Sequence, residues 1–150
     1  MGFCGNARRT VAGMTDRLTA MSVDRVEQIY SSKTSSCQIM EADTEQGRIL
    51  AVEKNKRFFP LNSCYDAKKA SKEWAEQFDR EDINDNSTII VYGLSDGRSI
   101  LELCRKRSNC RVIIYEPCQE IFWKAMEYEE VAQIAENENV CLIVKGICEE

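Results

Sequence analysis

The spacing of hydrophobic residues changes along the chain and divides it into three parts. Residues 1–36 are polar with a basic start, and the apolar positions between Asp16 and Tyr30 predict an amphipathic helix followed by a serine-rich connector. Residues 37–62 hold three short apolar segments separated by polar turns, which predicts a small antiparallel hairpin or meander. Residues 63–150 combine helical spacing with continuous apolar runs, as expected of an α/β unit. The residues expected on the apolar face of the first helix are Leu18, Met21, Val26 and Ile29.

Turn residues mark the boundaries inside the middle part. Gly47 and Asn55 lie between the apolar segments, and both residue types favour the backbone conformations of tight turns. Pro60 has no backbone N–H, so it places the third segment at an edge of the sheet.

The third part begins with a helix and continues into three strands. Asp66 is a good N-cap for a helix in which apolar residues recur at helical spacing over residues 67–78. Continuous apolar runs follow at residues 89–91, 112–114 and 141–144. Such runs are typical of parallel strands that are covered on both faces.

Two helical patterns separate the three runs, one at residues 100–107 and one at residues 121–135. The order is therefore β–α–β–α–β, with parallel strands and right-handed crossovers. We predict one half of a Rossmann-like fold, from about residue 87 to about residue 146. The fold class is α/β, and the antiparallel segment and the N-terminal helix precede this unit.

The first strand of the parallel unit, residues 88–92, is expected to have an unpaired outer edge. In a complete doubly wound sheet a fourth strand lies beside it, and here the chain stops at Glu150, soon after the third strand. An uncovered strand edge invites pairing with other chains. We expect residues 37–62, a second copy of the chain or further residues of a longer protein to cover this edge.

Composition removes several classes of function. The net charge of −5 argues against nucleic-acid binding, which needs a basic surface for phosphates. The chain has no histidine, so a Ser-His-Asp or Cys-His catalytic system is excluded within it. The eight cysteines include no C-x-x-C pair, which argues for free buried thiols and against a metal site. No secretory signal or membrane-length apolar run is visible, so we expect a cytoplasmic protein without a membrane partner.

Two features fall at the carboxyl ends of predicted strands, where open α/β sheets bind their ligands. Gly93, Ser95, Asp96 and Gly97 belong to a glycine loop between the first strand and the next helix, whose N-terminus presents free N–H groups. Glu116 ends the second strand and is placed to hydrogen-bond the hydroxyls of a ribose. These residues form the candidate nucleotide-binding site, and no catalytic residue is assigned.

The same loop departs from known nucleotide-binding patterns. Ser95 stands where a dinucleotide or methyltransferase loop has its middle glycine, and Asp96 adds a negative charge that would repel a phosphate. Val91 stands where a methyltransferase strand has an acid. Two interpretations therefore stay open: a site for a nucleotide or S-adenosylmethionine, and a turn with only a structural role.

The order of these motifs resembles the N-terminal region of the Maf proteins, the motility-associated factor glycosyltransferases of bacteria. In that family a β segment leads to a helix start of the type SxYDPxxEA, then to a strand with GxGxGYH and a strand ending in EP followed by IF. The resemblance covers about residues 45–146, and Arg98-Ser99 replaces the Tyr-His of the family pattern. The matching positions are Ser63, Tyr65, Asp66, Gly93, Gly97, Glu116, Pro117, Ile121 and Phe122.

The resemblance implies a role rather than a reaction. Maf proteins are thought to transfer nonulosonic, sialic-acid-like sugars from a CMP-activated donor to flagellin, and their transferase core follows this region. Nothing in the chain corresponds to that core, so no catalytic residue is carried over. The expected function is an N-terminal accessory or scaffold domain of a longer glycosyltransferase, with a downstream transferase domain and flagellin as partners. A CMP-sugar would then be the nucleotide at the glycine loop.

Two other functions stay open. An S-adenosylmethionine-dependent methyltransferase-like domain would use Gly93, Gly97 and Glu116 to hold its cofactor. A non-enzymatic interaction domain would pair through its exposed sheet edge and form a homo-oligomer.

Overall fold

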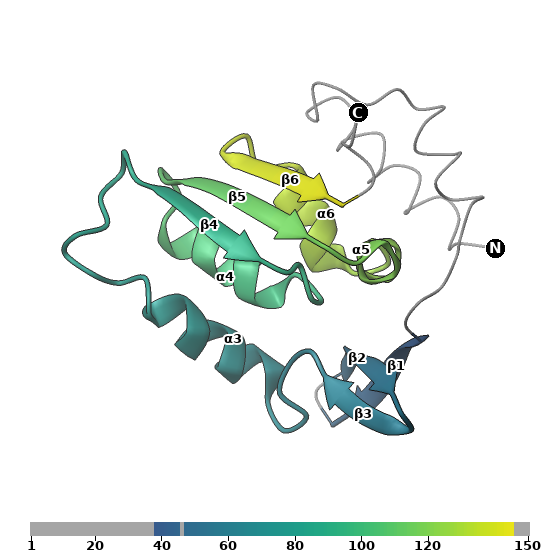
Figure 1. The fold of residues 1–150 in the computed structure, drawn as a ribbon. Coiled ribbons are helices and arrows are strands. Elements are labelled where there is room, and N and C mark those ends of the chain that lie inside the picture. The colour runs from purple at the N-terminus through teal and green to yellow at the C-terminus, as the bar shows by residue number, and fades with distance from the viewer. Residues whose placement is uncertain (1–37, 46, 146–150) are drawn as a thin grey trace.

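Two small sheets and four helices make up the part of the chain that the computed structural model describes, residues 38–45 and 47–145 (Figure 1). The helix expected between Asp16 and Tyr30 lies outside these residues. The described part is mixed α and β, with an antiparallel sheet first and a parallel sheet with helices after it. None of its helices is long and apolar enough to cross a membrane.

The antiparallel sheet contains the three strands predicted for the middle part of the chain. They are β1 (Gln38–Thr44), β2 (Gly47–Lys54) and β3 (Arg57–Pro60), in the spatial order β1-β2-β3. Asn55 and Lys56 join β2 to β3 with φ angles of 54° and 61°, so both central residues of this tight turn are left-handed. The proline of β3 lies in an edge strand, as expected from its missing N–H.

Helix α3 (Ala67–Glu76) connects the two sheets and begins where the sequence predicts. The Asp66 side chain accepts a hydrogen bond from the backbone N–H of Lys69 at 2.8 Å, so it caps the first turn. The helix packs against helix α4 (Arg98–Lys106) through a buried stripe of small residues. These residues are Ala67, Ser71 and Ala75.

The parallel sheet has three strands that lie side by side in chain order. They are β4 (Thr88–Tyr92), β5 (Arg111–Glu116) and β6 (Val140–Val144), with β5 in the centre. Both strand pairs are parallel, which confirms the strand direction expected from the three apolar runs. Helix α4 connects β4 to β5 and buries one apolar side in the core.

The second helical pattern forms two helices, where the sequence indicated one continuous pattern. Helix α5 (Gln119–Ala125) ends before Tyr128, and helix α6 (Glu129–Ala135) begins directly after it. The backbone of Tyr128 is extended, with φ −93° and ψ 136°. Its hydroxyl donates a hydrogen bond to Glu41 of β1 at 3.3 Å, so a contact with the other sheet accompanies the break.

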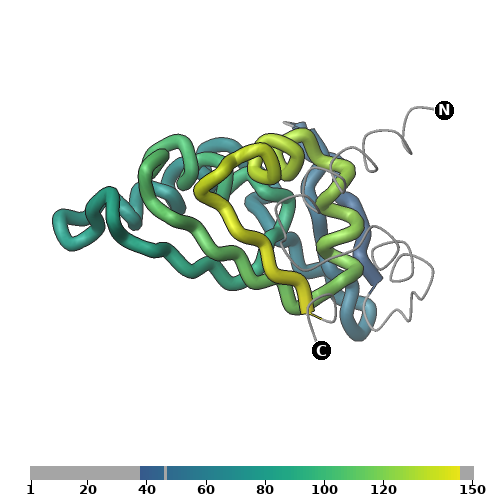
Figure 2. Tube along the Cα trace, turned by 90° about the horizontal axis from the view of Figure 1, so that it is seen from above, coloured from purple at the N-terminus to yellow at the C-terminus, as the bar shows by residue number. Residues whose placement is uncertain are grey.

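Only one face of the parallel sheet is covered within the described residues, which corrects the expectation of two covered faces. Figures 1 and 2 show helices α4 and α6 on the same side of the three strands. Alternate strand residues on that side are buried, because successive side chains of a strand point to opposite faces. They are Ile89, Val91, Val112, Ile114, Leu142 and Val144. On the other face, Ile90 and Tyr92 are 73% and 76% exposed.

The outer edge of β4 is not covered by the antiparallel sheet, because β1, β2 and β3 form a sheet of their own. In the described part β4 pairs only with β5. Helix α3 lies beyond β4, on the side away from β5, and packs against α4 (Figure 1). The expectation that residues 37–62 cover this edge is therefore wrong.

Candidate functional site

The glycine loop follows β4 and turns the chain into helix α4. Three of its residues have left-handed backbones, with φ of 95° at Gly93, 54° at Ser95 and 80° at Gly97. A Cβ at Gly93 would meet no atom within 4 Å, so only the backbone conformation favours glycine there. A Cβ at Gly97 would lie 2.7 Å from Cγ2 of Val131 in α6. Gly97 is therefore needed for close packing of the loop on α6 as well as for its backbone conformation.

Ser95 ties the loop to the end of the antiparallel sheet. Its hydroxyl donates a hydrogen bond to the backbone carbonyl of Leu61 at 2.9 Å, one residue beyond β3. The side chain that replaces the middle glycine of the nucleotide-binding pattern is thus directed at the protein's own backbone.

Asp96 is a buried carboxylate at the start of α4. The side chain is 1% exposed, and its Oδ1 accepts the backbone N–H of Arg98 at 3.2 Å. The Asn62 amide donates to both oxygens, at 3.2 and 3.1 Å, and Nη1 of Arg98 lies 3.1 Å from Oδ2. Burial raises the pKa of Asp96 above 3.8, and Arg98 and Asn62 oppose the rise. This carboxylate occupies the place at a helix N-terminus where a bound anion would lie.

Arg98 connects the loop to the elements around it. Its Nε lies 3.2 Å from Oε1 of Glu130 in α6, and its Nη2 donates to the backbone carbonyl of Arg48 in β2 at 2.9 Å. The guanidinium carbon lies 5.7 Å from the ring centroid of Tyr128, within the range of a cation–π contact. One side chain thus joins the loop, α6 and the antiparallel sheet.

Glu116 is buried behind the loop. The residue is 1% exposed, and its two carboxylate oxygens accept the backbone N–H groups of Leu94 and Cys118, both at 2.7 Å. Burial raises the pKa of Glu116 above 4.5, and these two hydrogen bonds oppose the rise. The carboxylate therefore fastens the glycine loop to the end of β5, with both oxygens already engaged.

The structure brings the sequence-predicted site residues together, but its acids face the protein's own groups. Sequence reasoning missed Asn62 and Arg98, which complete the cluster around Asp96. Asn62 lies 34 positions before Asp96, so no local spacing could reveal this contact. Arg98 was visible only as a departure from the tyrosine of the Maf pattern.

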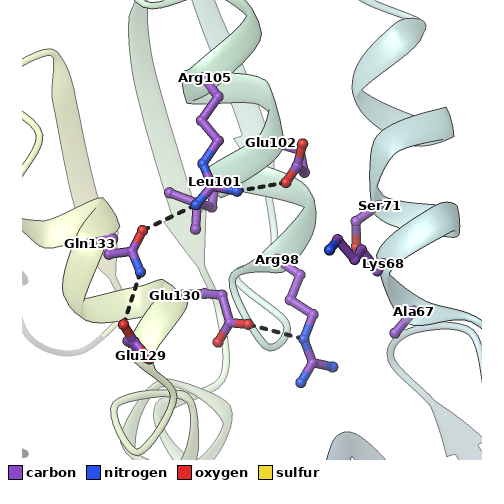
Figure 3. A pocket seen from close by; sticks show the side chains of 10 residues that line it. All are labelled: Ala67, Lys68, Ser71, Arg98, Leu101, Glu102, Arg105, Glu129, Glu130 and Gln133. Carbon is purple, nitrogen blue, oxygen red and sulfur yellow. Dashed lines mark hydrogen bonds and ion pairs between the residues drawn. The ribbon is translucent and has the colours of Figure 1, made fainter. Parts of the chain in front are cut away.

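A cleft of about 320 Å³ lies among α3, α4 and α6 and shares Arg98 with the cluster around Asp96 (Figure 3). Arg105 pairs with Glu102 at 2.8 Å, and Arg98 pairs with Glu130 at 3.2 Å. Because these cations and carboxylates pair with one another, the cleft presents little unbalanced charge to a ligand. It is lined by Ala67, Lys68, Ser71, Arg98, Leu101, Glu102, Arg105, Glu129, Glu130 and Gln133.

The cysteines of the described ranges form neither a disulfide nor a metal cluster there. The five that lie there are free thiols, and no group of three or more potential metal ligands gathers among those residues. Burial raises the pKa of Cys104 and of Cys118 to about 11, so both thiols are protonated at neutral pH.

No protein-family model matches this chain, and no curated protein matches it. The polar groups of the glycine loop bond to the protein itself: the loop is hydrogen-bonded to Glu116 at the end of β5, to the start of α4 and to the residue after β3.

Proposed function

We propose that this chain is a non-catalytic scaffold domain, of the kind that its resemblance to the N-terminal region of Maf glycosyltransferases implies. The order of motifs from Ser63 to Phe122 supports this proposal, and so does a glycine loop that is bonded to the protein's own groups. The domain would support a downstream transferase domain that adds a sialic-acid-like sugar to flagellin. The parallel unit would be one half of a Rossmann-like sheet, and the free thiols fit the bacterial cytoplasm.

One observation carries the non-catalytic part of the proposal: Asp96 fills the anion position at the start of α4. A phosphate 4 Å away would meet a repulsion of about 4 kcal/mol per unit charge at an effective dielectric constant of about 20. It would also compete for the guanidinium of Arg98, which already contacts Asp96 and Glu130. A nucleotide would have to displace buried groups before it could bind.

Isothermal titration with CMP, CDP and a CMP-sugar tests whether the loop binds a nucleotide. We expect no heat of binding from the natural chain at millimolar ligand. The matched variant is Gly93→Asp, which adds a carboxylate where the loop has open space. Binding by the natural chain that this variant abolishes would show a working nucleotide site at the loop and overturn the argument from Asp96.

S-adenosylhomocysteine tests the methyltransferase alternative. At a hundredfold excess over Kd, binding at one site adds about 2.7 kcal/mol to the free energy of unfolding, which raises the Tm measurably. We expect no shift at millimolar ligand, and a clear rise would favour the methyltransferase over the scaffold. Sugar transfer by the isolated chain would contradict the scaffold role directly.

A second candidate function, an interaction domain, rests on the outer edge of β4, which pairs with no strand among the residues that the structure describes. The carbonyl of Ser87 and the N–H of Gly93 bond to the β5 side, so the odd-numbered residues between them turn their backbone groups toward β5. The backbone groups of Thr88, Ile90 and Tyr92 therefore point to the outer edge. Sedimentation velocity at several protein concentrations tests this function, and a strict monomer would contradict a homo-oligomer.

A further inference from the structure

One face of the parallel sheet is covered by no helix of the described residues, and its side chains are mostly apolar. We call it the open face. Its six central side chains lie in two rows across the strands: Ile90, Ile113 and Cys141, then Tyr92, Tyr115 and Ile143. The ring centroids of Tyr92 and Tyr115 lie 5.6 Å apart. Complete burial of one exposed large apolar side chain stabilises a protein by about 1.5–3 kcal/mol, so Ile90 and Tyr92, which are 73% and 76% exposed, would gain most from an element that covered this face. The other four residues of the two rows are already half-buried.

The dimensions of the open face fit a single helix. Strands about 4.8 Å apart and a rise of about 3.3 Å per residue give three strands, of which β4 and β6 have five residues each, a footprint of about 14 by 17 Å. A helix of 15 residues is about 22 Å long and about 10 Å wide, which is nearly the same area. One such helix would therefore cover most of the two rows.

The same dimensions argue for an occupant that is tethered to the sheet. A stable complex between separate molecules buries about 800 Å² on each partner, several times the footprint of this face. A tethered segment can dock with less area, because a short linker gives it an effective concentration in the millimolar range. The small face thus disfavours a second copy and favours a segment of the same chain.

We propose that residues 16–30 of this chain, which the sequence predicts as an amphipathic helix, cover the open face. Seven residues, 31–37, connect this segment to β1 and can span up to about 24 Å when extended. Strand β1 contacts α5, which follows the carboxyl end of β5, so the connector begins near the tyrosine row. Leu18 and Ile29 would supply the centre of the apolar contact. This inference does not depend on the function proposed above.

The thiol of Cys141 is a natural reporter, because it lies in the first row of the open face. Pulse alkylation with N-ethylmaleimide, followed by mass spectrometry of the peptides, measures how fast the Cys141 thiol reacts in the full chain. Exposed Cys64 is the internal reference for reagent reactivity, and buried Cys104 reports any global unfolding.

The decisive comparison uses two variants that introduce the same charge on opposite sides of the predicted helix. Leu18→Asp changes a residue on the apolar side of the predicted helix. Ala20→Asp changes a residue two positions later, which is rotated by about 200° around the helix axis and so lies on the polar side. We expect Leu18→Asp to speed alkylation of Cys141 at least about tenfold, a ratio equal to about 1.4 kcal/mol of docking free energy. Ala20→Asp should leave the rate of Cys141 unchanged, and Cys64 should react equally in all three proteins.

Three results would overturn the proposal. The first is an alkylation rate of Cys141 that is the same in the natural chain and in Leu18→Asp. The second is an equal change of that rate in Leu18→Asp and in Ala20→Asp. Protection that grows with protein concentration would show that a second copy covers the face. A cross-link in the folded Met21→Cys variant gives an independent check, since a short bismaleimide should join position 21 to Cys141, and absence of that product would contradict docking.

Discussion

Replacing Arg98 with methionine tests how the glycine loop is held. The change removes the cation that faces Asp96 but keeps an apolar stem of similar length against Tyr128. Asp96 is 1% exposed and the Arg98 side chain is 18% exposed. Removing one partner of a buried ion pair costs about 3–5 kcal/mol, and we expect about 3 kcal/mol because Arg98 keeps some contact with water.

A second substitution separates the ion pair from other losses. In the double variant Arg98→Met with Asp96→Asn, the uncompensated charge is gone and the asparagine carbonyl still faces the first turn of α4. The double variant should therefore be more stable than Arg98→Met alone, and the double-mutant cycle should give a coupling of about 1–3 kcal/mol. The hydrogen bond from Arg98 to Arg48 is lost in both proteins and cancels from the comparison.

The loss of stability in the Arg98→Met variant should depend on pH, and the pKa of Asp96 sets the direction of that dependence. Burial raises the pKa of Asp96 above 3.8 and Arg98 opposes that rise, so the pKa is raised further in the Arg98→Met variant. A raised carboxyl pKa contributes stability that is present below 3.8 and is lost as the pH rises through the folded-state pKa. The deficit of Arg98→Met should therefore be smallest near pH 4 and largest at pH 7.

Urea unfolding, followed by tryptophan fluorescence at several pH values, measures these differences in the free energy of unfolding. A cost below about 1 kcal/mol at pH 7 would place the pair among weak surface ion pairs and refute the argument. A double variant no more stable than Arg98→Met would show that the charge of Asp96 is not what the arginine compensates.

The same unfolding assay tests three further expectations. Glu116→Gln should lose about 2 kcal/mol at pH 7, because a buried backbone N–H then faces an amide N–H. The natural chain should lose stability relative to Glu116→Gln as the pH rises from 4.5 through the raised folded-state pKa of Glu116. A difference in unfolding free energy that does not change with pH would contradict a pKa raised by burial. Gly97→Ala should cost about 2–4 kcal/mol through strain and the clash with Val131, against about 1–2 kcal/mol for Gly93→Ala, and equal costs would exclude the packing term. Asp66→Ala should cost about 1 kcal/mol by removing the cap of α3, and no loss would show that the cap is redundant.

Much of the fold could be predicted because its signals are local. The cap at Asp66, the turn at Asn55 and the edge position of Pro60 depend on a residue and its close neighbours in the chain. The three parallel strands followed from continuous apolar runs and the helical patterns between them. The break at Tyr128 was missed, because it accompanies a contact with Glu41, 87 positions away.

The sequence by itself determined the strands, the helices α3 and α4, and the collection of residues at the carboxyl end of β4. The tertiary structure decided what those residues face. Asp96 meets Asn62, 34 positions away, and Glu116 meets Leu94, 22 positions away, and in both cases a buried carboxylate takes its partners from the chain itself. The tertiary structure also decided that, in the described residues, helices cover only one face of the parallel sheet. The sequence could not show this, because β-branched residues favour strands whether one face or both faces are buried. Contacts of this kind depend on how distant segments pack, and no spacing along the chain encodes them.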